Sequence, residues 1–241
     1  QLWEIGRHRI ICGDCTDRAV VERVMGGEKA GAVVTDPPYK VISGGNSSPA
    51  STANYGWKSS VLAANDGRIF KHNSIKFSDY MVHLYRVLNS GSHCYIMVNN
   101  LNLRDLLNVA EEVGFGFHNL LRGDKNTVNA NRWYMKDCEY TAFFYKKPAK
   151  SINQPGSKQG FACKTLRGDE KSHATQKPIE LMQHYIENSS QPGDLVLDPF
   201  AGAGTTAVAA KLSGRRFITC EIDPQWYLAT VMRLKKAARW Q

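Results

Sequence analysis

The chain has 241 residues, of which 42% are hydrophobic, and its formal net charge is +9. This length fits one α/β domain, and the basic excess favours a polyanionic partner, although a basic protein without one would carry the same charge. No apolar run approaches the roughly 20 residues of a membrane helix, so we expect no membrane association.

Six cysteines are present, and Cys12 and Cys15 form a C-x-x-C pair. A zinc site needs a second pair of ligands at suitable spacing, and a redox pair needs a thioredoxin-like context. The sequence shows neither, so we expect reduced thiols, no metal site and a cytoplasmic protein.

Strand-like and helix-like segments alternate along the chain. In chain order we predict a strand at 9–12, a helix at 17–25, a strand at 32–35, a helix at 79–88, a strand at 93–98, a helix at 101–113, strands at 115–121 and 139–145, a helix at 178–188, a strand at 194–197, a helix at 205–212, a strand at 216–220 and a helix at 224–239. Alternation of this kind indicates a mainly parallel sheet with helices on both faces. Ligands of such sheets bind beyond the carboxyl ends of the strands.

Two segments, 40–76 and 149–175, interrupt the alternation. The first is rich in Ser, Asn, Gly and Lys, and the second lies in a stretch where basic residues outnumber acidic ones. Long connections in a compact domain are usually functional or disordered. We therefore expect a single domain over 1–241 that carries two inserted loops.

Residues 195–206, LVLDPFAGAGTT, predict a strand, a tight turn and the start of a helix. Gly202 and Gly204 remove side chains where a ligand could approach the backbone. The helix that follows presents free N–H groups and a partial positive charge, which suit a carboxylate or a phosphate. Asp198 can accept a hydrogen bond from an ammonium group.

A second acid, Glu221, closes the strand that follows this helix. A carboxylate in that place can accept hydrogen bonds from both hydroxyls of a ribose, and Ile222 could pack on an adenine face. The pattern predicts a nucleoside cofactor. NAD remains a second candidate, because Ala207 is tolerated at the third glycine position of its G-x-G-x-x-G fingerprint.

The run VVTDPPY at 33–39 ends the strand predicted at 32–35. An amino group on an aromatic base is a poor nucleophile, because its lone pair is delocalised into the ring. The Asp36 carboxylate and the Pro37 carbonyl could each accept one of its hydrogens, and the consecutive prolines, with Pro38, fix the backbone. Tyr39 could stack on a base taken out of a duplex.

These two motifs resemble those of the amino-group DNA methyltransferases, in which Asp-Pro-Pro-Tyr is catalytic and the Asp-Pro-Phe-Ala-Gly-Ala-Gly type of segment binds S-adenosylmethionine. The order here, catalytic motif first, is similar to the β group of that family. The resemblance implies a Rossmann-like S-adenosylmethionine-dependent methyltransferase fold, with a mainly parallel seven-stranded sheet and one antiparallel strand. It also implies a prokaryotic or phage setting, which suits restriction-modification.

The residues and the resemblance together assign three roles. The first two follow from the motifs, and the third follows from the length and charge of the two loops. The catalytic residues would be Asp36, Pro37, Pro38 and Tyr39. The residues around S-adenosylmethionine would be Asp14, Cys15, Thr16, Lys177, Asp198, Phe200, Gly202, Gly204, Thr205, Glu221 and Ile222. The DNA contacts in the two loops would be Asn46, Tyr55, Lys58, Lys158, Lys164 and Arg167.

The activity that the resemblance implies is methylation of adenine N6 in DNA, with base flipping. Cytosine-N4 methylation is the alternative, and a catalytically inactive DNA-binding module is an alternative of another class. Residues 2–9 also resemble methyltransferase modules that follow a ParB-like domain in longer chains. A homodimer is left open.

Overall fold

The computed structural model describes residues 1–38, 75–129, 134–163 and 177–237. In this part of the chain nine strands form one sheet in the order β1-β2-β9-β8-β3-β4-β6-β5-β7. The strands are β1 (Leu2–Ile5), β2 (His8–Cys12), β3 (Ala30–Thr35), β4 (Leu88–Val98), β5 (Gly116–Asn129), β6 (Lys136–Tyr145), β7 (Gly160–Cys163), β8 (Leu195–Asp198) and β9 (Arg216–Glu221). The helices are α1 (Arg18–Met25), α3 (Phe77–Val87), α4 (Leu103–Val113), α5 (Ile179–Ser189), α6 (Thr205–Leu212) and α7 (Pro224–Ala237).

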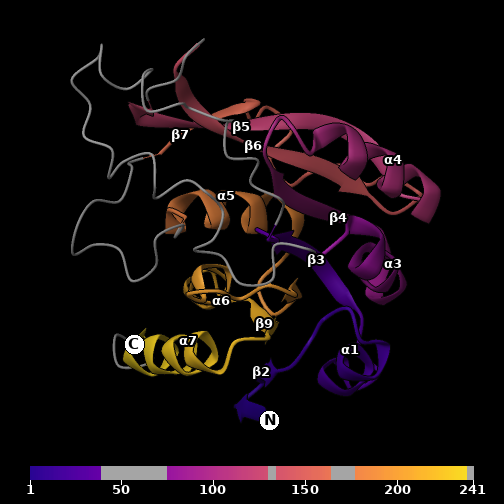
Figure 1. Cartoon of the computed structure of the whole chain (residues 1–241), viewed down its shortest axis with the longest axis vertical. Coiled ribbons are helices and arrows are strands. Elements are labelled where there is room, and N and C mark those ends of the chain that lie inside the picture. Colours follow the sequence, from indigo (N-terminus) through magenta and orange to yellow (C-terminus); the bar gives the residue numbers. More distant parts are fainter. Residues whose placement is uncertain (39–74, 130–133, 164–176, 238–241) are drawn as a thin grey trace, which may run out of the picture.

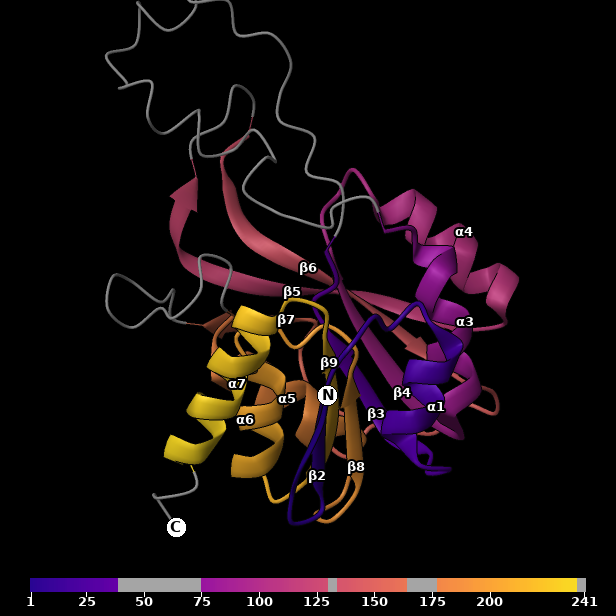
Figure 2. The ribbon, with the colours of Figure 1, turned by 60° about the horizontal axis from the view of Figure 1, so that its bottom comes forward.

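Helices cover both faces of the sheet, as predicted. Helices α1, α3 and α4 lie on one face, and α5, α6 and α7 lie on the other (Figures 1 and 2). Each layer has its own apolar core, with Leu84 and Leu106 in the first and Met182 and Ala209 in the second. In the described residues, no helix has the length and apolar character needed to cross a bilayer.

The sheet differs from the prediction at its two edges. The seven neighbouring strands from β2 to β5 in the sheet order match the expected arrangement. Strand β6 is antiparallel to both of its neighbours, β4 and β5. The pairs β2–β9, β9–β8, β8–β3 and β3–β4 are parallel, and so is the pair of β5 with β7. The additional strands are β1, an antiparallel partner of β2, and β7, which lies inside the 149–175 segment predicted as a loop. Both are only four residues long and carry little periodicity, so the sequence alone did not indicate them.

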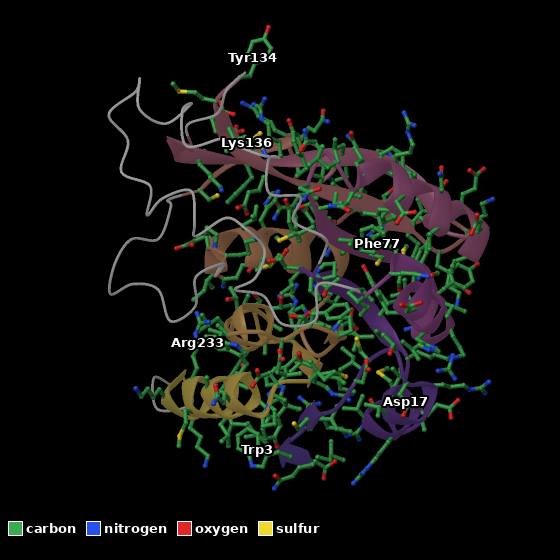
Figure 3. The ribbon with its side chains drawn as sticks, viewed as in Figure 1. Trp3, Asp17, Phe77, Tyr134, Lys136 and Arg233 are labelled. Atoms are coloured by element: carbon green, nitrogen blue, oxygen red, sulfur yellow. The ribbon has the colours of Figure 1, made fainter. Side chains whose placement is uncertain are left out.

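The hairpin of β5 and β6 is longer than predicted. Pairing continues through polar residues, with Gly123 opposite Glu139 and Asn129 opposite Lys136. The hydrophobic pattern that predicted these strands stops before that point, because the outer half of the hairpin packs against little of the core. Tyr134 at its end is 93% exposed (Figure 3).

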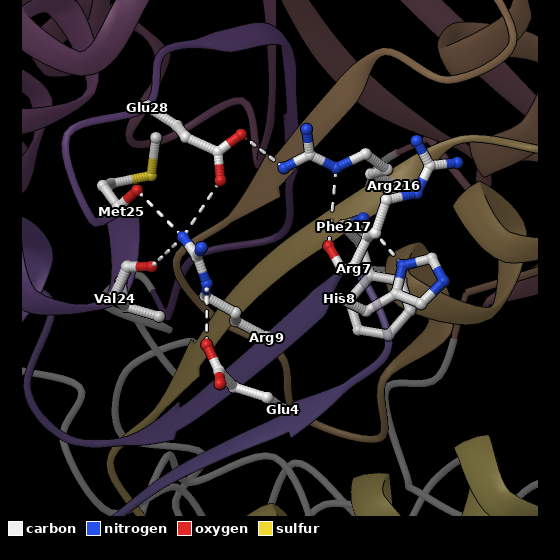
Figure 4. A network of polar contacts seen from close by, with 9 residues as sticks. All are labelled: Glu4, Arg7, His8, Arg9, Val24, Met25, Glu28, Arg216 and Phe217. Atoms are coloured by element: carbon white, nitrogen blue, oxygen red, sulfur yellow. Dashed lines mark hydrogen bonds and ion pairs between the residues drawn. The ribbon is translucent and has the colours of Figure 1, made fainter.

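A polar network ties the amino end of β9 to β2 and α1 (Figure 4). The Arg9 guanidinium donates to the carbonyls of Val24 and Met25 at 3.3 and 3.0 Å and forms an ion pair with Glu28 at 3.1 Å. Glu28 also pairs with Arg216 at the start of β9. These contacts hold β2, α1 and β9 together at the amino ends of the strands, which lie opposite the carboxyl ends of β2 and β9.

Candidate functional site

The acidic residues predicted at strand ends lie along one edge of the sheet. Strands β2, β9, β8 and β3 are neighbours and run parallel, so their carboxyl ends meet at that edge. Asp36 follows β3, Asp198 ends β8, Glu221 ends β9, and Asp14 lies two residues beyond β2. The topology therefore brings together residues that are up to 207 positions apart in the sequence, Asp14 and Glu221.

Asp198 is held by the two strands beside it. Its Oδ1 accepts a hydrogen bond from Thr35 Oγ1 at 2.7 Å and another from the Phe200 N–H at 3.1 Å. Its carbonyl accepts from Thr219 Oγ1 on β9 at 2.7 Å. Only 4% of Asp198 is exposed, and this burial raises its pKa to about 6 even though the hydrogen bonds from Thr35 and Phe200 lower it.

Asp36 lies beside a lysine from another part of the chain. Lys177 Nζ is 2.9 Å from Asp36 Oδ2 and 3.2 Å from Glu139 Oε2. Lys177 is 8% exposed, Pro37 is buried and Pro38 is half-buried. Tyr39, the fourth residue of the predicted catalytic motif, lies outside the described residues. Lys177, predicted as a cofactor contact, therefore lies beside Asp36 of the predicted catalytic motif.

The two glycines of the turn after β8 have different surroundings. Both have positive φ, +49° at Gly202 and +73° at Gly204. A Cβ on Gly202 would meet nothing within 4 Å, whereas a Cβ on Gly204 would lie 2.6 Å from Thr230 Cγ2. Gly202 therefore leaves open space that a ligand could use, and Gly204 allows α7 to pack closely.

Side chains of helix α7 hydrogen-bond to this turn and to the start of α6. Thr230 Oγ1 donates to the Gly202 carbonyl at 2.8 Å. Arg233 reaches from α7 to the start of α6, where it donates to the Ala203 carbonyl at 2.8 Å and to Thr205 Oγ1 at 3.2 Å (Figure 3). Thr205 is thus a partner of Arg233 as well as the first residue of α6.

Glu221 links the glycine turn to β9. Its Oε2 accepts from the Gly202 N–H at 2.8 Å, and its Oε1 accepts from the Asp223 N–H at 2.9 Å. Burial raises the pKa of Glu221, although these backbone hydrogen bonds lower it. Each oxygen retains acceptor capacity for a further donor. Ile222, next to it, is 39% exposed.

The turn after β2 completes the edge. The Gly13 N–H donates to the Glu221 carbonyl at 2.9 Å. Asp14 Oδ1 accepts from the N–H and the hydroxyl of Thr16, at 2.9 and 2.8 Å. Cys15 points into the core and is 5% exposed, and burial raises the pKa of its thiol well above the usual range. Its side chain is therefore an apolar neighbour and not a thiolate.

Two of the remaining predicted site residues, Phe200 and Lys158, lie in the described part of the chain. Phe200 is half-buried and makes an edge-to-face contact with Tyr80, with ring centroids 4.8 Å apart. Lys158 is exposed. The predicted DNA contacts that lie outside the described residues are Asn46, Tyr55, Lys58, Lys164 and Arg167.

Four residues of the site were missed in the sequence: Thr35, Glu139, Thr230 and Arg233. Each acts through a partner on a different element, so no local spacing indicates it. Only Glu139 could have been noticed in the sequence, because it is a carboxylate at the start of an otherwise apolar and aromatic predicted strand.

Known proteins share both the sequence pattern and the fold. A family model described as DNA methylase matches residues 31–232. The DNA adenine methyltransferase YhdJ of Escherichia coli (strain K12) is 39% identical over 101 residues, which cover 40% of this chain and 34% of YhdJ. The aligned segments span only 21% to 34% of the first four curated relatives.

Two solved structures show the same architecture. The crystal structure of an M1.HpyAVI–SAM complex has a TM-score of 0.66 at 24% identity and covers 93% of this chain and 98% of that chain. PvuII DNA methyltransferase (cytosine-N4-specific) has a TM-score of 0.64 at 16% identity and covers 97% and 91%. The predicted Rossmann-like methyltransferase fold is confirmed.

The glycine turn gives a first prediction. Gly202→Ala should lower the free energy of unfolding by about 1–2 kcal/mol, the cost of positive φ for an L-residue. Gly204→Ala should cost about 1–3 kcal/mol more, because its Cβ overlaps Thr230. Urea unfolding measures both, and adding Thr230→Ser, which removes Cγ2 and keeps the hydroxyl, should recover part of the Gly204→Ala loss. Equal losses at the two glycines, with no recovery, would show that the overlap is unimportant.

The buried Asp198 gives a second prediction. Its folded-state pKa lies above the unfolded value, so its charge costs stability above pH 6, and this cost disappears as the pH falls toward 4. Asp198→Asn should therefore raise the free energy of unfolding at pH 8 by up to about 3 kcal/mol, because the amide oxygen can still accept from Thr35 and Phe200. Urea unfolding at pH 4 and pH 8, with exposed Asp137→Asn as the control, measures this gain. A gain that does not change with pH would contradict the assignment.

Proposed function

The chain belongs to the DNA methylase family of amino-group methyltransferases, and on that premise we propose that it transfers a methyl group from S-adenosylmethionine to the N6 amino group of adenine in DNA. One observation carries the proposal. Thr35 and Asp36, at the end of β3, and Asp198, at the end of β8, lie side by side, because Thr35 donates to Asp198. This contact places the proposed motif for the amine next to the proposed motif for the cofactor.

Asp36 and Pro37 would act on the target amine. As acceptors of its two hydrogens they make the nitrogen lone pair available for attack on the methyl carbon. The Lys177 ammonium, 2.9 Å from Asp36, favours the ionised carboxylate that this role requires. Pro37 and Pro38 fix the backbone, and Tyr39 would stack on the extruded base.

The residues at the ends of β8 and β9 fit S-adenosylmethionine. The open space at Gly202 admits a ligand to the backbone, and the start of α6 offers a positive helix end to its carboxylate. Asp198 would accept from its ammonium group, Glu221 from its ribose hydroxyls, and exposed Ile222 would cover its adenine. When bound, S-adenosylmethionine supplies the electrophilic methyl group. Further contacts would come from Asp14, Cys15, Thr16, Lys177, Phe200, Gly204 and Thr205.

Cytosine N4 is the second candidate acceptor, because PvuII DNA methyltransferase, which its title describes as cytosine-N4-specific, shares the fold. Two observations favour adenine. Asp36 stands where cytosine-N4 enzymes of this kind more often have Ser, and the relative YhdJ is named an adenine methyltransferase. An inactive DNA-binding module is disfavoured, because Asp36 and Asp198 keep their partners.

DNA would lie across the same edge of the sheet. The net charge of +9 and the exposed Lys158 support phosphate contacts, and base contacts would come from the 40–76 loop. A single catalytic domain over 1–241, a cytoplasmic location, a homodimer and an upstream ParB-like domain remain predictions of the sequence.

The acceptor role predicts a split between chemistry and binding. Asp36→Ala should reduce the rate of methyl transfer to duplex DNA by about a hundredfold to ten-thousandfold, because it removes the acceptor of an amine hydrogen. Affinity for S-adenosylmethionine should stay within about threefold. Transfer of a radiolabelled methyl group and isothermal titration calorimetry measure the two quantities. A rate of methyl transfer in Asp36→Ala equal to that of the wild type would contradict the acceptor role of Asp36.

The ribose contact predicts a loss of affinity. Glu221→Ala should weaken S-adenosylhomocysteine binding by about 1.5–3 kcal/mol, since a charged acceptor is lost. The variant also loses the bonds from Gly202 and Asp223, so a ligand without ribose hydroxyls is the control. This analogue should bind the wild type weakly and lose little further affinity in the variant. Equal losses for both ligands would place the ribose elsewhere, and NAD binding in preference to S-adenosylhomocysteine would overturn the cofactor.

A further inference from the structure

Four side chains of alternating charge form consecutive ion pairs from the β5–β6 hairpin to Asp36. Lys125 on β5 pairs with Glu139 on β6 at 2.6 Å, Glu139 pairs with Lys177 at 3.2 Å, and Lys177 pairs with Asp36 at 2.9 Å. In the sheet β4 separates β3 from β6, so Lys177 spans the end of β4 to reach both carboxylates. The chain of contacts connects elements that are not neighbours.

Lys177 depends on these carboxylates. It is 8% exposed, and a buried ammonium is tolerated only when it is paired and hydrogen-bonded. Burial would raise the pKa of Glu139, yet Lys177 and Lys125 hold it at about 2, so Glu139 is ionised at any working pH. Asp36 and Glu139 are the carboxylates of the described residues that form ion pairs with Lys177, and of these two Glu139 has no part in the proposed chemistry.

On the premise that the chain transfers methyl groups as proposed above, we propose that Glu139 is a positioning residue that sets the place of Lys177 beside Asp36. Lysine has a long flexible stem and a compact charge, so a single partner does not fix the ammonium. A second anchor on β6 does, and it divides the charge between two carboxylates. The Lys177 ammonium then offsets the charge of Asp36 at Oδ2, while the Asp36 carboxylate stays oriented toward the target amine.

A simpler role would leave Glu139 as half of an ion pair that stabilises the hairpin together with Lys125. The two roles differ in what they predict for Lys125. If Glu139 acts through Lys177, the loss of Lys125 leaves that contact in place. If Glu139 only joins the strands, the loss of either partner has the same effect.

A double-mutant cycle tests the proposal on the full chain. The variants are Glu139→Gln, Lys177→Met and both together, and the readouts are kcat and KM with duplex DNA and S-adenosylmethionine, and the thermal midpoint. We expect Glu139→Gln to lower kcat about tenfold or more, and to change the KM for S-adenosylmethionine, which Lys177 also contacts in the proposed site, by no more than Lys177→Met does. The double variant should be no slower than Lys177→Met, because residues that act as a unit are not additive. Effects that multiply in the double variant would overturn the proposal.

Two matched variants complete the design. Lys125→Met should keep kcat within about threefold of the wild type, and Glu180→Gln, the same substitution at an exposed site on α5, within about twofold. A loss in Lys125→Met as large as that in Glu139→Gln would assign Glu139 to the hairpin alone. If Glu139→Gln does not fold, Glu139→Asp replaces it in the cycle under the same criterion. A wild type without methyl transfer would refute the proposed function, whereas an active wild type with an additive cycle refutes only the role of Glu139.

Discussion

The hydrogen bond from Thr35 to Asp198 is the contact on which the site depends. It joins the ends of two parallel strands whose motifs are more than 160 positions apart, and it is buried. Because the two strands are also paired directly, with Val33 opposite Leu197, the sheet itself sets the distance between the proposed catalytic motif and the proposed cofactor motif. Side chains at the ends of packed strands are positioned more precisely than side chains on loops.

This arrangement has an energetic cost. Asp198 is buried with its pKa raised, so its ionised carboxylate makes the folded state less stable than the protonated form would. A free-energy cost of this kind is common where binding requires a buried charge. The surrounding elements offset it, since Thr35 and Thr219 satisfy Asp198, while α7 supports the adjoining turn through Thr230 and Arg233. Residues distant from the chemistry therefore maintain the geometry of the site.

The sequence predicted the parts of the site that are local in the chain. Asp36, Asp198 and Glu221 follow short apolar strands, and parallel topology places strand ends together, so their shared edge was predictable. Contacts between elements were not, because nothing in the spacing around Glu139 indicates Lys177. The edge strands β1 and β7 and the outer half of the β5–β6 hairpin were missed for a related reason. Their pairing is made by backbone hydrogen bonds between short or polar segments, which leave no hydrophobic period.

The central claim is that this edge of the sheet methylates an exocyclic amino group. Duplex DNA incubated with the full chain and S-adenosylmethionine carrying an isotopically labelled methyl group, then digested to nucleosides for mass spectrometry, tests it most directly. The account predicts that the label appears in N6-methyldeoxyadenosine. Label in N4-methyldeoxycytidine would keep the chemistry and overturn the choice of base. Label on a ring carbon of cytosine, or no labelled nucleoside at all, would contradict the account.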